Sequence, residues 1–573
     1  MTMKKLIALL LAGLMAVSAV GCASTPSDSS STTSGDSTSS TTSGTEAQKS
    51  NYAGTSDPDM VTIDVRAEPP DLNPTTTNDV ASADILRLTT AGLFKLDEND
   101  QPVPDLAESY KVSEDGKTYT IKLREDAKWN NGDPVTAHDF IYSWTISMTE
   151  KTASTYGFIL YNNIENGLKF YKGECDASEL GCKAIDDYTL EVTFNNPLTY
   201  ALNLFAFQSY LPVNQKIYEA AGTNSDGTSL YNKEIDTMAY NGPYYVSEWV
   251  HDDHITMTKN EDFYDADSIK IPKLNYVMMT DANARLNAFQ AGQVDSINVN
   301  AEQIKQLEAL NEPVYSYTDN SNWYFQYNIE GNKILSNAKI RKALGDAIDP
   351  ESYVNNVVAN GSVVANGLVP TSINGANDGK YVDGREDLMD HDTAGAKALF
   401  DEGLKELGMT LEDVGTLTYV CDDQTKARTE AEYFQNQWKT VLGIDVEISP
   451  MTFKARLDAM DNGNFDIVFA GWSPDYNDAM TFLDMFMVDN GNNYGKYNNP
   501  EYDELLNEAM QEVDAAKRQE ILQQAETILI KDDYAVYPLY FSVITYVQSN
   551  KISGMTRTGF QEFDFCDGAE IVK

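Results

Sequence analysis

The chain has 573 residues, 42% of them apolar and 10% aromatic, which is enough material for more than one packed domain. Lys and Arg total 42 against 88 Asp and Glu, so the formal net charge is −46. This balance repels phosphate backbones and anionic lipid surfaces, and it argues against nucleic acid as a partner.

The first residues have the pattern of an export signal. A positively charged start precedes an apolar run over 6–17, and small residues lead to Cys22. This predicts a signal peptide over 1–21, because the run is too short for an ordinary transmembrane anchor. Residues 18–22 resemble a bacterial lipobox, with Ala19 where Leu is usual, which implies lipidation of Cys22 as the mature N-terminus. Cleavage nearby into a freely secreted protein is the alternative.

Residues 22–56 follow as a stretch dominated by Ser, Thr, Gly, Asp and Pro. Such a composition has almost nothing to bury, so it predicts a disordered tether. A flexible chain of this length has a root-mean-square span of roughly 30 Å. That span lets a globular body sit above a membrane surface.

Four more cysteines follow Cys22. Cys175 and Cys182 flank a short polar loop that a disulfide could close in an exported protein. Cys421 and Cys566 lie far apart in the sequence without a CxxC pair, which argues against a zinc site and favours buried thiols.

Strand-like and helix-like stretches alternate irregularly from Val61 onward, which predicts a mixed α/β or α+β architecture. Residues 118–123 and 189–194 alternate with a period of two, as half-buried strands do. Residues 283–290 have helical spacing, and Gly292 suits the left-handed position after the helix.

Two helices and a strand are expected towards the C-terminus. Asn499 is a predicted N-cap, followed by proline at the first turn and by apolar residues at helical spacing. A second helix through 521–528 leads to a strand over 536–541. Pro538 in that strand predicts an edge position or a strand end.

Residues 107–140 read AESYKVSEDGKTYTIKLREDAKWNNGDPVTAHDF. This string closely resembles the signature region of the oligopeptide and dipeptide solute-binding protein family, with its alternating strand, Trp129, an Asn-Gly-Asp turn and a helix start. Further family-like landmarks follow in the expected order at 241–244, 285–295, 337–350 and 465–483. The resemblance covers nearly all of the chain from Val61 to Phe565.

The resemblance implies an α/β fold with two lobes, of the periplasmic-binding-protein-like class II or Venus-flytrap type. A ligand cleft lies between the lobes, and the first lobe has an extra subdomain. The expected ranges are 57–92, 201–276 and 542–573 for subdomain I, 93–200 for subdomain II, and 277–541 for the second lobe. The chain is expected to cross between lobes near Tyr276 and Phe541.

The segment FDIVFAGWSPDYNDAMTFL at 465–483 is similar to the peptide-specific branch of the family. The resemblance implies that Asp475, in an Asp-Tyr pair, neutralises the ligand's α-amino group. Physically, an ionised carboxylate in a closed cleft offers both charge and acceptors to an ammonium group with three donors. The alternative for Asp475 is a surface residue in a Ser-Pro-Asp turn.

The resemblance implies further ligand contacts at Gly471, Trp472, Tyr476, Tyr156, Phe453, Tyr244, Asp79, Val80, Ala81 and Tyr327. For most of the aromatic residues, core packing is the alternative. Phe469 stands where some relatives carry a basic residue near the ligand's carboxylate, so recognition of a free C-terminus is not predicted.

Catalytic and metal-binding motifs are incomplete. Residues 471–475 begin like a nucleophile elbow but lack its closing Gly, and 375–380 lack the Ser/Thr of a phosphate loop. His251 and His254 could chelate a metal, and nickel carriers are a branch of this family, but their segment has the pattern of a hairpin turn. We expect no enzymatic activity, no cofactor and no metal.

Together these features predict a monomeric lipoprotein, anchored outside the cytoplasm to a bacterial cell membrane. It would capture oligopeptides and pass them to the permease subunits of an ABC importer. A carrier for oligosaccharides or nickel and a peptide-sensing surface receptor are the alternatives. In a sugar carrier, stacked aromatic rings would matter more than Asp475.

Overall fold

The computed structural model describes residues 49–65, 68–77, 79–225, 227–279, 281–488 and 490–572. The predicted signal peptide, the lipidation site Cys22 and the tether up to residue 48 lie outside these ranges. Within them, no helix combines the length and the apolar character that a membrane span requires.

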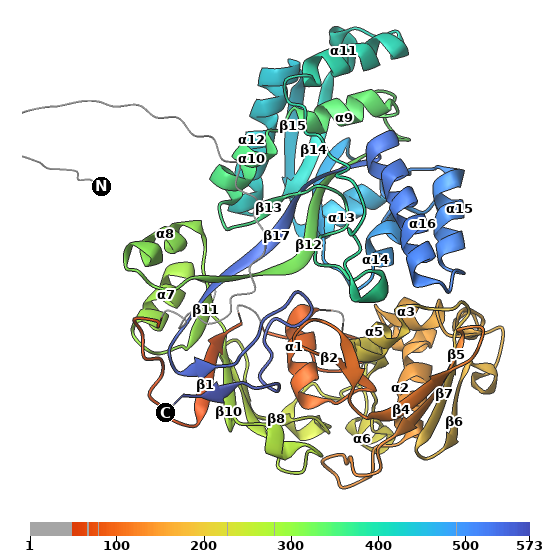
Figure 1. Ribbon diagram of the computed structural model, residues 1–573, viewed down its shortest axis with the longest axis vertical. Helices are drawn as coiled ribbons and strands as arrows, with labels where there is room; N and C mark the ends of the chain where they lie inside the picture. The colour runs from red at the N-terminus through yellow and green to blue at the C-terminus, as the bar shows by residue number, and fades with distance from the viewer. Residues whose placement is uncertain are drawn as a thin grey trace, which may run out of the picture. The chain divides into compact units, whose positions relative to one another are not determined.

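A mixed sheet of 11 strands connects two lobes (Figure 1). Its main path runs in the order β15 (Asp445–Met451), β14 (Thr416–Asp422), β16 (Ile467–Trp472), β12 (Tyr315–Tyr327), β17 (Val536–Gln548), β11 (Ser296–Asn298), β1 (Met60–Asp64), β10 (Lys273–Val277), β9 (His254–Lys259) and β8 (Tyr244–Val250). We call the body around β1 and β8–β10 the first lobe and the body around β14–β16 the second lobe. The expected two-lobed α/β class is confirmed.

Two long strands, β12 and β17, join the lobes. They pair antiparallel, with a register shift between Trp323 and Tyr324 of β12. Pro538 lies near the start of β17, opposite Tyr324 at this shift. On the other side of β17, β11 pairs with 546–548 and β13 (Val363–Val364) with 540–541, so no described strand pairs with Pro538 there. The predicted position at an edge or strand end is confirmed, because a residue without an N–H group is tolerated where one side of the strand is unpaired.

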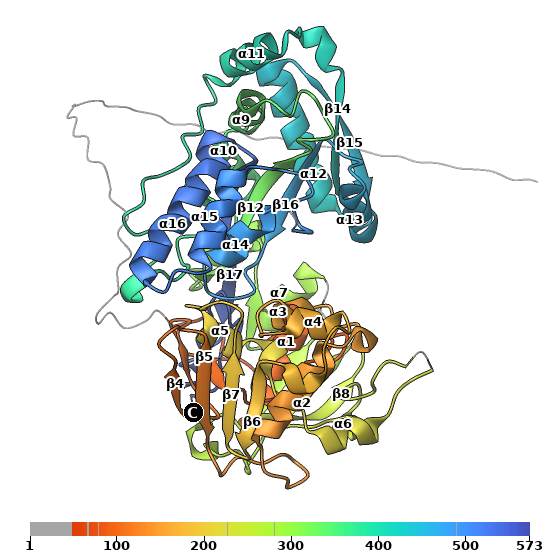
Figure 2. The ribbon, with the colours of Figure 1, turned by 90° about the vertical axis from the view of Figure 1, so that its right-hand side faces the viewer.

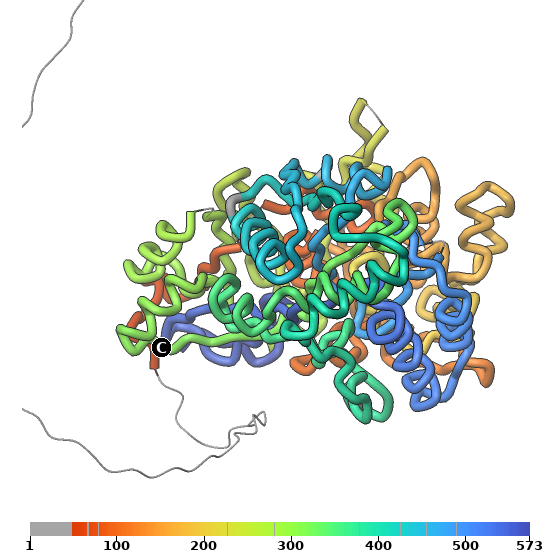
Figure 3. The backbone as a smooth tube through the Cα atoms, turned by 90° about the horizontal axis from the view of Figure 1, so that it is seen from above, coloured from red at the N-terminus to blue at the C-terminus, as the bar shows by residue number. Residues whose placement is uncertain are grey.

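The first crossing between the lobes lies in β12 and not near Tyr276. Tyr276 belongs to β10, which pairs with β1, and the chain then continues through α7 (Ala282–Gln290), β11 and α8 (Ala301–Ala309). β11 pairs with β1 and with the end of β17. In Figure 3, the blue C-terminal part of the chain returns to the green part near the end marked C. Phe289, Ile297 and Val547 share one small core, which holds this unit on the first lobe.

Several elements expected from local patterns are confirmed. β5 (Thr118–Leu123) pairs antiparallel with β7 (Thr189–Thr193). Asn499 caps α15 (Pro500–Ala509), and α16 (Ala515–Thr527) follows it. Gly292 has a φ of +69° after α7, a conformation that glycine adopts without a steric penalty.

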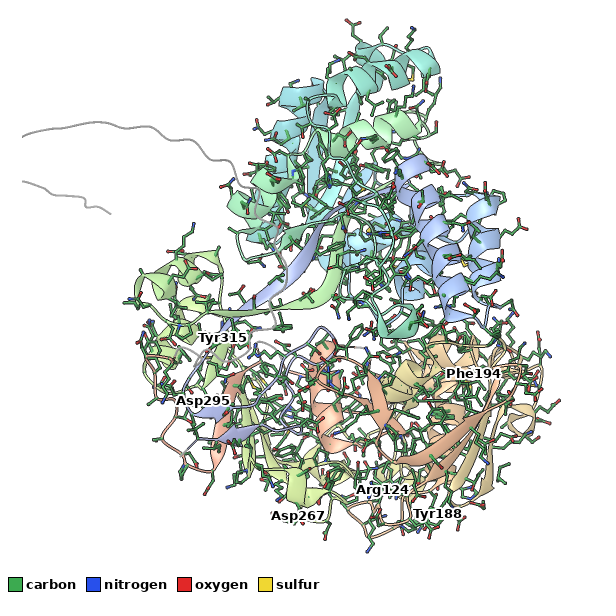
Figure 4. All side chains as sticks on the ribbon, in the orientation of Figure 1. Arg124, Tyr188, Phe194, Asp267, Asp295 and Tyr315 are labelled. Carbon is green, nitrogen blue, oxygen red and sulfur yellow. The ribbon has the colours of Figure 1, made fainter. Side chains whose placement is uncertain are left out.

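The signature segment 107–140 forms scaffold. It contains β4 (Ala107–Val112), β5 and the start of α2 (Ala137–Ser147). β4 and β5 belong to a four-stranded sheet, which β7 and β6 (Cys182–Asp186) complete (Figure 2). Thr136 and Asp139 form a capping box at the start of α2. Arg124, labelled in Figure 4, stacks 3.3 Å from the ring centre of Tyr264. The residues that carry the resemblance therefore hold the first lobe together.

The end of the predicted tether, at 49–56, is packed against the first lobe, which corrects the expectation of disorder there. The backbone N–H of Thr55 donates to Asp295 Oδ1 at 2.6 Å, and Tyr52 packs against Phe289 with ring centroids 5.0 Å apart. Asp295 is fully buried and lies near β11 (Figure 4). A buried carboxylate that accepts backbone N–H groups orders this polar stretch.

Helices pack on the strands of the second lobe (Figure 1). They include α9 (Ala338–Asp346), α11 (Ala396–Leu407), α12 (Thr425–Gln437), α13 (Phe453–Asp461), α14 (Met480–Leu483), α15 and α16. Phe469 of β16 lies in an aromatic core with Phe325 and Phe434, at centroid distances of 4.9 and 5.1 Å. Phe469, which stands where some relatives carry a basic residue, therefore occupies a core position in this protein.

Candidate functional site

A cavity of about 370 Å³ receives side chains from both lobes. The first lobe contributes α1 (Val80–Thr89), the segment after α5 (Ala201–Ala206) and the C-terminal loop at 558–567. The second lobe contributes residues 473–477, and β12 and β17 contribute residues between the lobes. The size matches that of pockets for small ligands.

Asp475 lies in this cavity, on the loop between β16 and α14. The hydroxyl of Tyr156 in the first lobe donates to Asp475 Oδ1 at 2.9 Å. On the other side, the backbone N–H of Asp475 donates to Thr481 Oγ1 at 3.3 Å. Two predicted site residues, 319 positions apart, are thus in direct contact across the lobes.

The surroundings of Asp475 are short of positive charge. Burial raises its pKa to about 6, although the hydrogen bond from Tyr156 opposes the rise. Burial, with the nearby charges of Asp475 and Asp478, raises the pKa of Asp484 to about 7. Arg518 is already paired with both oxygens of Asp478, at 2.7 and 2.8 Å. Among the described residues, no cation forms an ion pair with Asp475.

Tyr476 lines the cavity and stacks on Tyr200 of the first lobe, with centroids 4.6 Å apart and ring planes 8° from parallel. Next to it, the amide nitrogen of Asn477 donates to the carbonyl of Asp100 at 3.2 Å. These contacts join the lobes beside the Asp475 loop. They limit the access of water to that side of the carboxylate.

Gly471 and Trp472 lie on β16 but do not line the cavity. A Cβ at Gly471 would come within 2.7 Å of the Trp323 ring, so glycine permits this close packing. Trp472 Nε1 donates to Thr481 Oγ1 at 3.4 Å, the same hydroxyl that accepts the Asp475 N–H. Trp472 therefore supports the Asp475 loop from behind.

The predicted loop at 79–81 is partly at the cavity. Asp79 and Val80 line it, and Ala81 does not. The Asp79 carboxylate caps α1 and accepts from the backbone N–H of Ser82 at 2.8 Å. Val80 is 62% exposed and presents an apolar surface to the cavity.

Three predicted aromatic contacts lie elsewhere. Tyr244 is fully buried in the first-lobe core, where its hydroxyl donates to the carbonyl of Ile271 at 3.0 Å. Tyr327 is fully buried in the second-lobe core. Phe453 is 58% exposed at the start of α13, with the Arg456 guanidinium 5.1 Å from its ring centre. Core packing, the alternative for Tyr244 and Tyr327, is the correct interpretation.

Sequence reasoning missed other cavity residues. Arg87 of α1, Asp319 of β12, and Phe560 and Glu562 of the C-terminal loop all line it. No local pattern marks them, because they meet only when α1, the strands β12 and β17, and the end of the chain come together.

The structure also describes the cysteines of the predicted disulfide and the two histidines considered as metal ligands. Cys175 and Cys182 are free thiols, so the disulfide between them is not formed. His251 Nε2 lies 3.5 Å from Glu234, and His254 Nδ1 lies 2.6 Å from Asp253. Within the described ranges, no cluster of three or more His, Cys, Asp or Glu side chains is arranged to hold a metal ion.

Comparisons with known proteins identify a matching family and similar chains. Residues 101–494 match the family described as bacterial extracellular solute-binding proteins, family 5 Middle. The chain is 34% identical over 521 residues to the oligopeptide-binding protein OppA of Bacillus subtilis, covering 88% of this chain and 91% of that protein.

Two solved structures are similar over their full length. Listeria monocytogenes OppA bound to peptide has a TM-score of 0.74 at 33% identity, covering 90% of this chain and 99% of that one. The peptide-binding pheromone receptor PrgZ has a TM-score of 0.75 at 28% identity, covering 90% and 100%.

Proposed function

Because this chain belongs to the bacterial extracellular solute-binding proteins of family 5, we propose that it captures oligopeptides between its lobes and delivers them to an ABC-type importer. The protein acts as a monomeric lipoprotein, held outside the cytoplasm by a lipid on Cys22. It performs no catalytic step. One observation carries the peptide assignment: Asp475 lies in the cavity, bound to Tyr156 and without a cationic partner in the described chain.

The α-ammonium of a peptide supplies the missing charge. A charge-assisted hydrogen bond between an ammonium and a carboxylate is about twice as strong as a neutral one, and low water content strengthens it further. An extended peptide also offers backbone donors and acceptors along its length. Binding therefore depends on the amino terminus and the backbone more than on any one side chain.

The proposal is tested by native mass spectrometry of freshly purified protein, followed by calorimetry with a pool of tetrapeptides. We expect a ladder of peptide masses on the purified protein and saturable binding of the pool. Retention of a sugar or a nickel ion, with no peptide bound, would refute the peptide assignment.

Peptide affinity is expected to fall as the pH drops below about 6. The ammonium binds the carboxylate form of Asp475, whose pKa is about 6 in the free protein. Protonation removes the negative charge, so the association constant should decrease about tenfold per pH unit below this value. Calorimetry between pH 8 and pH 5 measures the profile.

The substitution Tyr156→Phe tests whether Asp475 causes this pH dependence of peptide affinity. It removes the hydrogen bond that stabilises the Asp475 carboxylate, so the pKa of Asp475 should rise and the fall in affinity should begin at higher pH. A profile with the same midpoint in both proteins would show that Asp475 does not control the pH dependence.

A peptide-sensing receptor is the second candidate, favoured by the similarity to a pheromone receptor. Its cavity would bind the same class of ligand. Deletion of the importer separates the two roles: peptide uptake stops if this protein serves transport, and a cellular response to peptide persists if it serves sensing.

A further inference from the structure

The first-lobe wall of the cavity contains a buried acceptor that no described residue of the protein uses. Gln208, just after α5, lines the cavity and is only 7% exposed. Its Nε2 donates to the carbonyl of Thr77 at 3.4 Å. Its Oε1 has no hydrogen-bond partner within the described part of the chain. A buried acceptor left unpaired costs about 1–3 kcal/mol.

The Thr77 carbonyl determines how the Gln208 amide is oriented. A carbonyl oxygen only accepts hydrogen bonds, so the NH₂ group of Gln208 must face it. The oxygen Oε1 is then the free end. Asn203, on α5, also lines the cavity, and its buried Oδ1 has no partner among the described residues, which makes this wall rich in acceptors.

The nearby carboxylate of Asp79 is already in use. Its Oδ1 accepts from the Ser82 N–H at 2.8 Å, and its Oδ2 accepts from the hydroxyls of Thr77 and Ser82 at 2.8 and 2.6 Å. Asp79 therefore serves the N-terminus of α1. Gln208 Oε1, with Asn203 Oδ1, therefore remains as an acceptor for a guest on this wall.

Contacts between neighbouring side chains link the segment of Gln208 to Tyr156 and Asp475. The ring of its neighbour Phe207 is 5.6 Å from the ring of Tyr156, whose hydroxyl binds Asp475. An extended peptide rises about 3.3 Å per residue. Gln208 and Asp475 line the same cavity, so a guest with its ammonium at Asp475 that extends along this wall would bring its first backbone N–H groups towards Gln208.

We propose that Gln208 Oε1 accepts a hydrogen bond from a backbone N–H near the amino terminus of the bound peptide. This inference rests on the proposed function. It makes recognition two-sided, because the second lobe binds the ammonium through Asp475 and the first lobe binds the adjacent backbone through Gln208. A peptide that satisfies both groups stabilises the contact between the lobes.

The test is a double-mutant cycle on peptide affinity. It combines the substitution Gln208→Met in the protein with tetra-alanine peptides that are each N-methylated at one peptide bond. Met has a similar length and no strong acceptor. For unmethylated peptide, we expect Gln208→Met to lower the affinity about tenfold. One methylated position should weaken binding to the wild-type protein but cause little further loss in the variant, because both changes remove the same bond.

Gln215→Met is the matched control, at an exposed position of α6 (Gln215–Ala221) in the same lobe. It should bind like the wild type. Gln208→Leu also lacks an acceptor and should show the same loss of sensitivity to methylation, which leaves the inference testable if Gln208→Met is poorly folded by thermal melting.

The failures of the two proposals are distinguishable. If the wild-type protein binds no peptide, both are wrong. If it binds peptide and Gln208→Met binds equally well, or no methylated position couples to the substitution, the inference on Gln208 is wrong and the proposed function stands.

Discussion

Asp475→Asn is expected to weaken peptide binding by about two to three orders of magnitude. Asn keeps the size of the side chain but removes its charge, so the ammonium of the guest is buried without a counter-ion. Removing one partner of a buried ion pair costs about 3–5 kcal/mol, and each 1.4 kcal/mol is about tenfold in affinity. Calorimetry at pH 7 with one tetrapeptide measures the loss.

The same substitution should raise the melting temperature of the ligand-free protein. Burial holds the pKa of Asp475 at about 6, above its ordinary value of 3.8. The stability that this group contributes is therefore complete below its unfolded pKa and is lost as the pH rises through 6, so the ionised form destabilises the fold at pH 7. A lower peptide affinity together with a higher melting temperature in Asp475→Asn would show that this carboxylate serves binding at a cost in stability.

Asp461→Asn, at an exposed position of α13, is the control for both measurements. It removes one negative charge from the same lobe, away from the cavity, and should leave affinity and melting temperature unchanged. Equal affinity of Asp475→Asn and the wild-type protein would rule out the ammonium pairing.

Glu526→Ala is expected to lower the free energy of unfolding of the second lobe by about 3–5 kcal/mol. Glu526 of α16 is fully buried and paired with Arg385 at 2.5 Å. Its Oε1 accepts the backbone N–H groups of Leu368 and Val369 at 2.7 and 3.0 Å. The substitution leaves a buried guanidinium without its anion and two amides without an acceptor.

Urea unfolding followed by tryptophan fluorescence measures this loss. Glu520→Ala, at an exposed position of the same helix, is the matched control and should change the unfolding free energy by less than about 0.5 kcal/mol. Similar unfolding curves for the two variants would show that the buried pair contributes little to the stability of this lobe.

Local chemistry explains which elements the sequence predicted well. Period-two alternation identified β5 and β7, and Asn499 with its following proline marked the start of α15. These signals are readable because caps and half-buried strands depend on neighbours within a few residues. The prediction for Pro538 succeeded for the same reason, because this residue lies near the start of β17, where only β12 pairs beside it among the described strands.

The site was predictable only in part, for the same reason. Asp475 and Tyr156 stood out by their resemblance to a family motif, and the structure brings them to 2.9 Å. Tyr244 and Tyr327 looked equally suitable but point into cores, since the side of a strand that faces a cavity is set by packing between distant segments.

By itself, the sequence determined the mixed α/β class, several local elements and the acidic residue expected to recognise an ammonium group. Only the tertiary structure decided that the end of the tether binds Asp295, that Cys175 and Cys182 remain free thiols, and that Gln208 keeps an unused acceptor at the cavity. The physical reason is that burial and the pairing of polar groups arise from contacts between residues hundreds of positions apart, which no local pattern encodes.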